Sequence, residues 1–231
     1  MAAGDGVFYV PAEKASRLFG VRARDGRVLW DVEPGAYPHG VAAVRGGVVA
    51  AAERGSEIAF VRGGHVTGRV PVARQPGGVA VVDGGRQVAV VSVRARVLEL
   101  YATQPPYRRL AGVPAGVGPT HIVAQGDWAW VADTQGDALL FFRVRPRLEL
   151  VRHVRLAGGP YGIALDPVRH RLWVTLNATN RIVELEAQGR PKVIANLPSV
   201  RQADDLAVDS RTGRVFVGSR TDDLVEIIDP R

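Results

Sequence analysis

The sequence predicts an all-β protein, a β-propeller of six blades with about 42 residues each. Three observations lead to this prediction. A proline-led motif recurs five times, short apolar strands follow each copy in the same order, and no segment keeps a 3.6-residue period over a helix length. With 231 residues, 46% of them hydrophobic, the chain is expected to form a single domain over residues 1–231.

The recurring motif predicts the innermost strand of each blade. Its copies read PHGVAAV, PGGVAVV, PTHIVAQ, PYGIALD and ADDLAVD, with spacings of 38, 43, 41 and 43 residues. One column of the motif is always a larger aliphatic residue: Val41, Val79, Ile122, Ile163 and Leu206. The next column is mostly alanine. Small side chains fit strands that crowd around a common axis, as the inner strands of a propeller do.

Three further strands are expected after each motif. The second strands are residues 48–53, 87–92, 128–133, 172–177 and 215–219. Three of the third strands nearly coincide, as VLEL (97–100), IVEL (182–185) and LVEI (224–227), and a looser fourth strand leads to the next motif. Four short strands separated by polar turns form the unit of a propeller blade. A sandwich would not repeat the same side chains, and a β-helix would have a much shorter repeat.

The ends of the chain predict two incomplete blades. Residues 7–35 match the second to fourth strands of a blade, and the six residues before them are too few for an inner strand and its turn. Residues 205–231 supply the first three strands of another blade. Six blades are favoured because each pair of second and third strands needs a blade of its own.

Two other arrangements of the ends stay open. In a five-bladed ring, residues 205–209 would complete the N-terminal blade and leave the last two strands to pack elsewhere. In the second arrangement, the chain is a segment of a longer propeller. Unpaired strand edges promote association, so the incomplete blades also suggest a homo-oligomer.

Several segments resemble known repeats. LWVTLNATNRIVELEAQG (172–189) resembles the YVTN repeat, and WVADTQGDALLFF (130–142) is similar to the related NHL repeat. The resemblance covers essentially the whole chain and, at the level of fold, extends to the streptogramin lyase and gluconolactonase-like propellers. It implies a β-propeller. It leaves the function open among lyases, lactonases and binding scaffolds.

Polar residues at the channel mouth are the candidate binding site. The turn before the inner strand and the turn after the second strand lie on the same face of a propeller, around the central channel. The predicted ligand-binding residues are His39, His121, Tyr161, Asp204, Asp205, Asp133, Asn177 and Glu53. His39, His121 and Asp204 are also candidate ligands for a divalent metal, the only cofactor that the sequence suggests.

No complete catalytic motif is present. The sequence lacks G-x-S-x-G, H-E-x-x-H and the phosphate-binding glycine motifs. The predicted function is therefore a non-catalytic scaffold that binds a small molecule or a protein at the channel mouth. The alternative, which the resemblance implies, is a metal-dependent lactonase or lyase acting at the same mouth. PHGVAAV is similar to the streptogramin lyase strands, while gluconolactonases place Glu, Asn and Asp at the mouth.

Composition narrows the partners and the compartment. The net charge is +7, but the arginines are scattered, so nucleic acid is not an expected partner. No apolar run is long enough for a transmembrane segment. The absence of cysteine excludes disulfides and thiolate nucleophiles. The first residues do not resemble a signal peptide, so the sequence indicates a cytoplasmic protein unless a leader has been removed.

Overall fold

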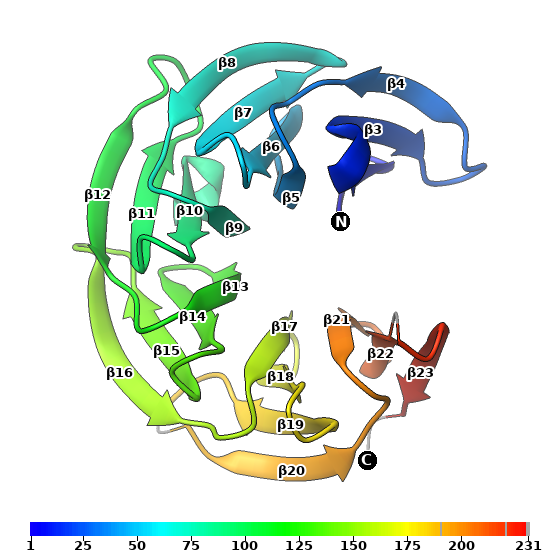
Figure 1. Ribbon diagram of the computed structural model, residues 1–231, viewed down its shortest axis with the longest axis vertical. Helices are drawn as coiled ribbons and strands as arrows, with labels where there is room; N and C mark the ends of the chain where they lie inside the picture. Colours follow the sequence, from blue (N-terminus) through cyan, green and yellow to red (C-terminus); the bar gives the residue numbers. More distant parts are fainter. Residues whose placement is uncertain (190, 220, 230–231) are drawn as a thin grey trace.

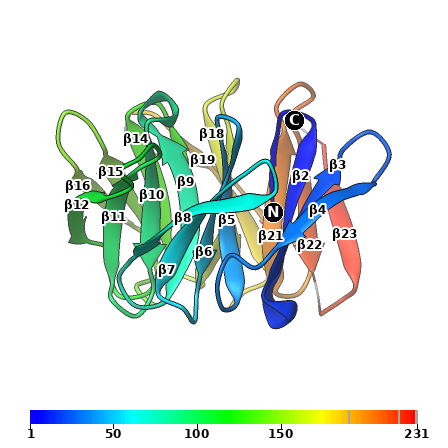
Figure 2. The ribbon, with the colours of Figure 1, turned by 90° about the horizontal axis from the view of Figure 1, so that it is seen from above.

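The chain folds into a six-bladed β-propeller in the computed structural model, which describes residues 1–189, 191–219 and 221–229. Figure 1 shows the inner strands β5, β9, β13, β17 and β21 around the centre, with the later strands of each blade further out. Figure 2 shows the same ring edge-on. Each blade is an antiparallel meander in which neighbours in sequence pair in space. The all-β prediction and the preferred blade number are confirmed.

The strands agree with the repeat. Blade 1 contains β1 (Ala2–Gly4), β2 (Val7–Ala12), β3 (Arg17–Arg22) and β4 (Val28–Val32). Blade 2 contains β5 (Pro38–Val44), β6 (Gly47–Ala52), β7 (Glu57–Arg62) and β8 (His65–Pro71). Blade 3 contains β9 (Pro76–Val82), β10 (Gln87–Ser92), β11 (Val97–Ala102) and β12 (Arg109–Pro114).

The other blades continue the pattern. Blade 4 contains β13 (Pro119–Gln125), β14 (Trp128–Asp133), β15 (Ala138–Arg143) and β16 (Glu149–Arg155). Blade 5 contains β17 (Pro160–Asp166), β18 (Arg171–Leu176), β19 (Arg181–Glu186) and β20 (Val193–Pro198). Blade 6 contains β21 (Ala203–Asp209), β22 (Arg214–Ser219) and β23 (Leu224–Ile228). Two 3-10 turns, η1 (Glu13–Ala15) and η2 (Asp83–Gly85), are the helical elements of the described residues.

The N-terminal blade corrects one prediction. It has its own inner strand, because the three residues of β1 pair with β2. Six residues suffice because Asp5 and Gly6 form a two-residue turn with φ values of 50° and 73°. Two consecutive residues with positive φ make the tightest hairpin connection. In the described residues, blade 6 alone lacks a fourth strand, as predicted.

The five-bladed alternative is excluded by the strand pairing. The inner strand β21 pairs with β22, so it belongs to blade 6 and does not complete blade 1.

At the ring centre, neighbouring inner strands approach closely. A Cβ atom on Gly40 of β5 would lie 2.0 Å from the carbonyl oxygen of Gly77 on β9. Glycine at position 40 is therefore required by the contact between blades 2 and 3.

The hydrophobic core lies between blades. Five clusters of buried side chains join blades 1 and 2, 2 and 3, 3 and 4, 4 and 5, and 5 and 6. In the cluster between blades 3 and 4, for example, Leu98 and Leu100 of β11 pack with Ile122 of β13 and Leu140 of β15. Successive strand residues point to opposite faces of a blade, so each inner blade contributes to two clusters.

The junction between blades 6 and 1, which we call the seam, is different. None of the clusters formed by described residues joins these two blades. Ile228 packs against blade 5, so Val225 and Ile227 lie on the opposite, seam-facing side of β23, where they are 63% and 56% exposed. Phe8 of β2 faces the seam from the other side and is also exposed. Both terminal blades thus present apolar faces to solvent.

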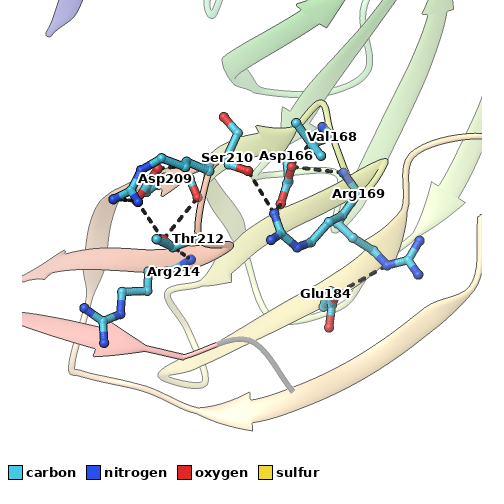
Figure 3. Close-up of polar contacts among 10 residues, drawn as sticks. Asp166, Val168, Arg169, Glu184, Asp209, Ser210, Thr212 and Arg214 are labelled. Carbon is cyan, nitrogen blue, oxygen red and sulfur yellow. Dashed lines mark hydrogen bonds and ion pairs between the residues drawn. The ribbon is translucent and has the colours of Figure 1, made fainter.

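Blade 6 is attached through blade 5. On the face away from the channel mouth, Arg169 donates hydrogen bonds to the Asp166 carboxylate at 3.0 Å and to the Ser210 carbonyl at 2.9 Å (Figure 3). Asp166 is the last residue of β17 and Arg169 lies in the turn that follows it, while Ser210 directly follows β21 in the next blade. This contact links the turns of neighbouring blades.

In the residues that the structure describes, no helix has the length and apolar character needed to cross a membrane.

Candidate functional site

A cavity of about 820 Å³ lies at the channel mouth. The first residues of the inner strands bring side chains from several blades into it. Of the predicted ligand-binding residues, His39, His121, Tyr161, Asp204 and Asp205 line this cavity. Blade 1 adds Met1, Pro11 and Glu13, and blade 6 adds residues 223–225, so the cavity extends to the seam.

An aliphatic ring forms the inner wall of the cavity. It consists of the repeat column Val41, Val79, Ile122, Ile163 and Leu206. On β5, β13, β17 and β21 these side chains lie one or two positions after the polar residues. The column is thus both a fold element and the apolar lining of the cavity. The polar groups lie nearer the mouth, and a ligand with an apolar body and a polar end matches this order.

His39 is oriented by a carboxylate. Its Nδ1 atom lies 2.5 Å from Oε1 of Glu13, which belongs to η1 of blade 1. Both side chains are half-buried. The same carboxylate accepts a hydrogen bond from Tyr37 and raises the pKa of that tyrosine. If Nδ1 donates to Glu13, Nε2 is the other polar edge of the His39 ring.

His121 is the neutral partner of His39. The ring centroids of the two histidines are 5.7 Å apart. Burial lowers the pKa of His121 to about 4, and the neighbouring His39 acts in the same direction, so the ring is neutral at pH 7. The Nδ1 atom of His121 lies 3.1 Å from the carbonyl oxygen of Tyr161. A carbonyl only accepts, so Nδ1 carries the proton and Nε2 is an acceptor.

Tyr161 and two aspartates complete the polar part of the cavity. The Tyr161 ring meets His121 edge-on, at a centroid distance of 4.6 Å and an interplanar angle of 77°. Asp204 and Asp205 come from β21. The Asp205 carboxylate opposes the lowering of the His121 pKa, which places the two groups within electrostatic range. Histidine, tyrosine and aspartate from blades 2, 4, 5 and 6 therefore converge at one site.

Three other predicted site residues do not line the cavity. Asp133 is fully buried and accepts hydrogen bonds from the backbone N–H groups of Val117 and Gly118, so it holds a turn between blades 3 and 4. Glu53 accepts a hydrogen bond from Gln75 at 2.7 Å. The backbone N–H of Asn177 donates to the Gly159 carbonyl.

Glu13 was missed by the sequence analysis. It directly follows β2, in the repeat column that also contains Glu53 and Asn177. This repeat column was the sequence signal that could have identified Glu13 as a site residue. The sequence predicts that blade 1 lacks its inner strand, so it does not place the following turn at the channel mouth. A shared column also does not fix the direction in which a side chain points. Glu13 reaches the cavity, whereas Glu53 accepts a hydrogen bond from Gln75.

The described residues show no preformed metal centre. They contain no group of three or more His, Asp or Glu side chains arranged to hold a metal ion. Among the candidate ligands, the Nδ1 atoms of His39 and His121 are already bonded to Glu13 and to the Tyr161 carbonyl. A metal would have to bind through the two Nε2 atoms, without a third His, Asp or Glu side chain of the described residues arranged to complete the site.

Comparisons with known proteins support the fold. The sequence matches no family model and no curated protein. A 6-phosphogluconolactonase-like protein from Bacteroides uniformis matches 96% of this chain and 80% of its own, with 15% identity and a TM-score of 0.81. A catalytically inactive virginiamycin B lyase from Staphylococcus aureus, solved with quinupristin, matches 99% of this chain and 82% of its own, with 15% identity and a TM-score of 0.75.

A third similar structure has no known function. It comes from Desulfotomaculum acetoxidans and matches 97% of this chain and 79% of its own, with 11% identity and a TM-score of 0.80. Each of the three is longer than this chain. At these identities the likeness concerns architecture, and the chain is a six-bladed β-propeller that shares its fold with lactonase-like and lyase propellers.

Proposed function

We propose that the chain is a binding module that holds a small organic molecule in the channel-mouth cavity. The observation that carries this proposal is the convergence of His39, His121 and Tyr161 from three blades on one cavity of about 820 Å³. Pockets for small ligands have volumes of about 300–1,000 Å³, with an apolar lining and a few convergent polar groups.

The His121 tautomer defines the polar end of the ligand. His121 is half-buried and lines the cavity, and its Nε2 atom is an acceptor. A ligand hydroxyl or N–H group would satisfy it. The aliphatic ring behind it would bury a hydrocarbon or aromatic body. The expected ligand is thus an apolar molecule with a hydrogen-bond donor at one end.

Two small probes test this proposal. In ligand-observed NMR, phenol should show saturation transfer from the protein, and its methyl ether anisole should bind at least several-fold more weakly because it has no donor. The variant His121→Phe removes the acceptor and should abolish the preference. His153→Phe, on the exposed part of β16, is the matched control. Equal binding of both probes, or no effect of His121→Phe, would overturn the proposal.

A second candidate function is acid–base catalysis of the lyase type. The Glu13–His39 pair favours it, because a carboxylate bonded to one imidazole nitrogen fixes the ring and leaves the other nitrogen to accept a proton. A structurally similar protein is a lyase that was solved with quinupristin. Under this hypothesis His39 takes a proton from a carbon atom of the substrate, and the C–H electron pair forms a double bond as the bond from the neighbouring carbon to the leaving group breaks. Glu13 stabilises the imidazolium, which then returns the proton to the leaving group.

Quinupristin separates the two candidate functions. A lyase of this specificity should consume quinupristin in a chromatographic assay, at a rate that falls at least tenfold in Glu13→Gln. The control is Glu57→Gln, whose carboxylate pairs with Arg69 away from the cavity. The binding-module proposal predicts that quinupristin stays intact with both variants and with the unchanged protein.

A further inference from the structure

The outer edge of blade 6 is an unpaired strand. In each of the other five blades the third strand is followed by an antiparallel fourth strand, as β11 is followed by β12. In blade 6 the third strand, β23, has a partner on one side only among the described residues. The repeat itself therefore shows what covers a third strand in this fold, namely an antiparallel strand about six residues long.

The unpaired edge is apolar. β23 has the sequence LVEII, in which Leu224, Val225 and Ile227 are 45%, 63% and 56% exposed. Its single charged residue, Glu226, is turned toward blade 5, where it accepts a hydrogen bond from the Ser199 hydroxyl at 2.6 Å. Natural edge strands are usually protected by lysine, proline or inward charges. The outermost strands β8, β12 and β20 each end in proline, and β23 does not.

We propose that β23 is the dimer interface of this protein, and that its occupant is the β23 strand of a second copy. Two copies related by a twofold axis place their edges antiparallel, which is the pairing that the fourth strand has in the other blades. The two three-stranded blades then form one continuous six-stranded sheet. Because the edge faces outward from the ring, the two propellers lie side by side.

The charges restrict the register of the pairing. A twofold axis through Glu226 would place the two glutamates opposite each other, which is unfavourable. An axis through Val225 or through Ile227 instead places an apolar residue opposite its own copy. In both of these registers the neighbouring strand residues from the partner cover the exposed aliphatic side chains. A second copy is favoured over an unrelated strand because this edge is self-complementary.

Solution mass and one charged variant test the proposal. Light scattering at micromolar concentrations should give about twice the 24.8 kDa of the chain. Ile227→Lys should give a monomer with an unchanged circular dichroism spectrum. Val193→Lys, which is 49% exposed on the outer strand β20, is the matched control and should remain a dimer. A monomeric unchanged protein, or a dimer that survives Ile227→Lys, would overturn the proposal.

Cross-linking locates the interface independently. The chain has no cysteine, so a single introduced thiol reports on one position. Directly opposed residues in an antiparallel pair have Cβ atoms about 4.5–5.5 Å apart, close to disulfide range. Val225→Cys or Ile227→Cys should give a covalent dimer under mild oxidation, and Val168→Cys, which is 67% exposed in a blade 5 turn, should not. Equal cross-linking at all three positions would contradict a β23 interface.

Discussion

Leu98 and Val225 occupy the same column of the repeat but have different surroundings. Both are the second residue of a third strand, and they pair with Val91 and Gly218 in corresponding registers. Leu98 is fully buried because blade 4 packs against it, whereas Val225 is 63% exposed because the next blade in the ring is blade 1, across the seam. The strand sequence determines which face is apolar. The next blade determines whether that face is buried.

The largest expected effect is on the buried member of this pair. Leu98→Ala should lower the free energy of unfolding by about 2–5 kcal/mol, because it removes a buried side chain and leaves a cavity. Val225→Ala should change it by less than about 0.5 kcal/mol when the protein is dilute enough to be monomeric. Urea unfolding of both variants measures the difference. Equal losses would mean that the seam is packed like the other five interfaces.

A second prediction concerns how the free energy of unfolding depends on pH through His121, which lines the cavity. The folded state keeps His121 neutral down to a pKa of about 4, while the side chain in the unfolded chain titrates near its ordinary value of 6.5. Between these values the unfolded chain binds more protons, so stability is lost as the pH falls from 6.5 to 4, by up to about 3 kcal/mol.

The variant His121→Gln isolates this contribution. Its unfolding free energy should fall less than that of the unchanged protein between pH 7 and pH 4.5. His153→Gln, on an exposed strand, should keep the full pH dependence. If His121→Gln and His153→Gln give the same slope, the buried neutral histidine is not the source of the effect.

A third, smaller pair of effects compares two turns. Asp133 and Ser219 both end the second strand of their blade. Asp133→Ala should destabilise by about 2 kcal/mol, because it leaves buried N–H groups of a closed interface without their charged acceptor. Ser219→Ala should cost about 1 kcal/mol, because the hydroxyl donates to the Arg201 carbonyl in the terminal blade. Thermal unfolding ranks the two, and the reverse order would contradict this account.

The repeat made most of the fold predictable. Its columns gave the blade number, the inner strands and the aliphatic ring of the cavity, because a propeller uses the same side chain for the same contact in each blade. The strand β1 was not predictable, because a turn as short as Asp5 and Gly6 leaves almost no sequence signal. It could not foresee the exposure of Val225, since burial there depends on how the ring ends.

The candidate site was predicted in part, for a related reason. His39, His121 and Tyr161 were expected at the mouth because each lies at the start of an inner strand, and strand direction follows from the repeat. Turn residues are harder to predict. Asp133 turns back to backbone N–H groups, whereas Glu13 reaches His39 in the next blade. These directions depend on local turn geometry and not on residue type.

The most direct measurement is the reactivity of single thiols at the two matched positions. Val225→Cys should react with a thiol reagent at nearly the rate of a free cysteine when the protein is dilute enough to be monomeric. Leu98→Cys should react slower by orders of magnitude, because labelling needs the blades to separate or unfold. If Val225→Cys is protected as strongly as Leu98→Cys under these conditions, the seam is closed and the central claim is wrong.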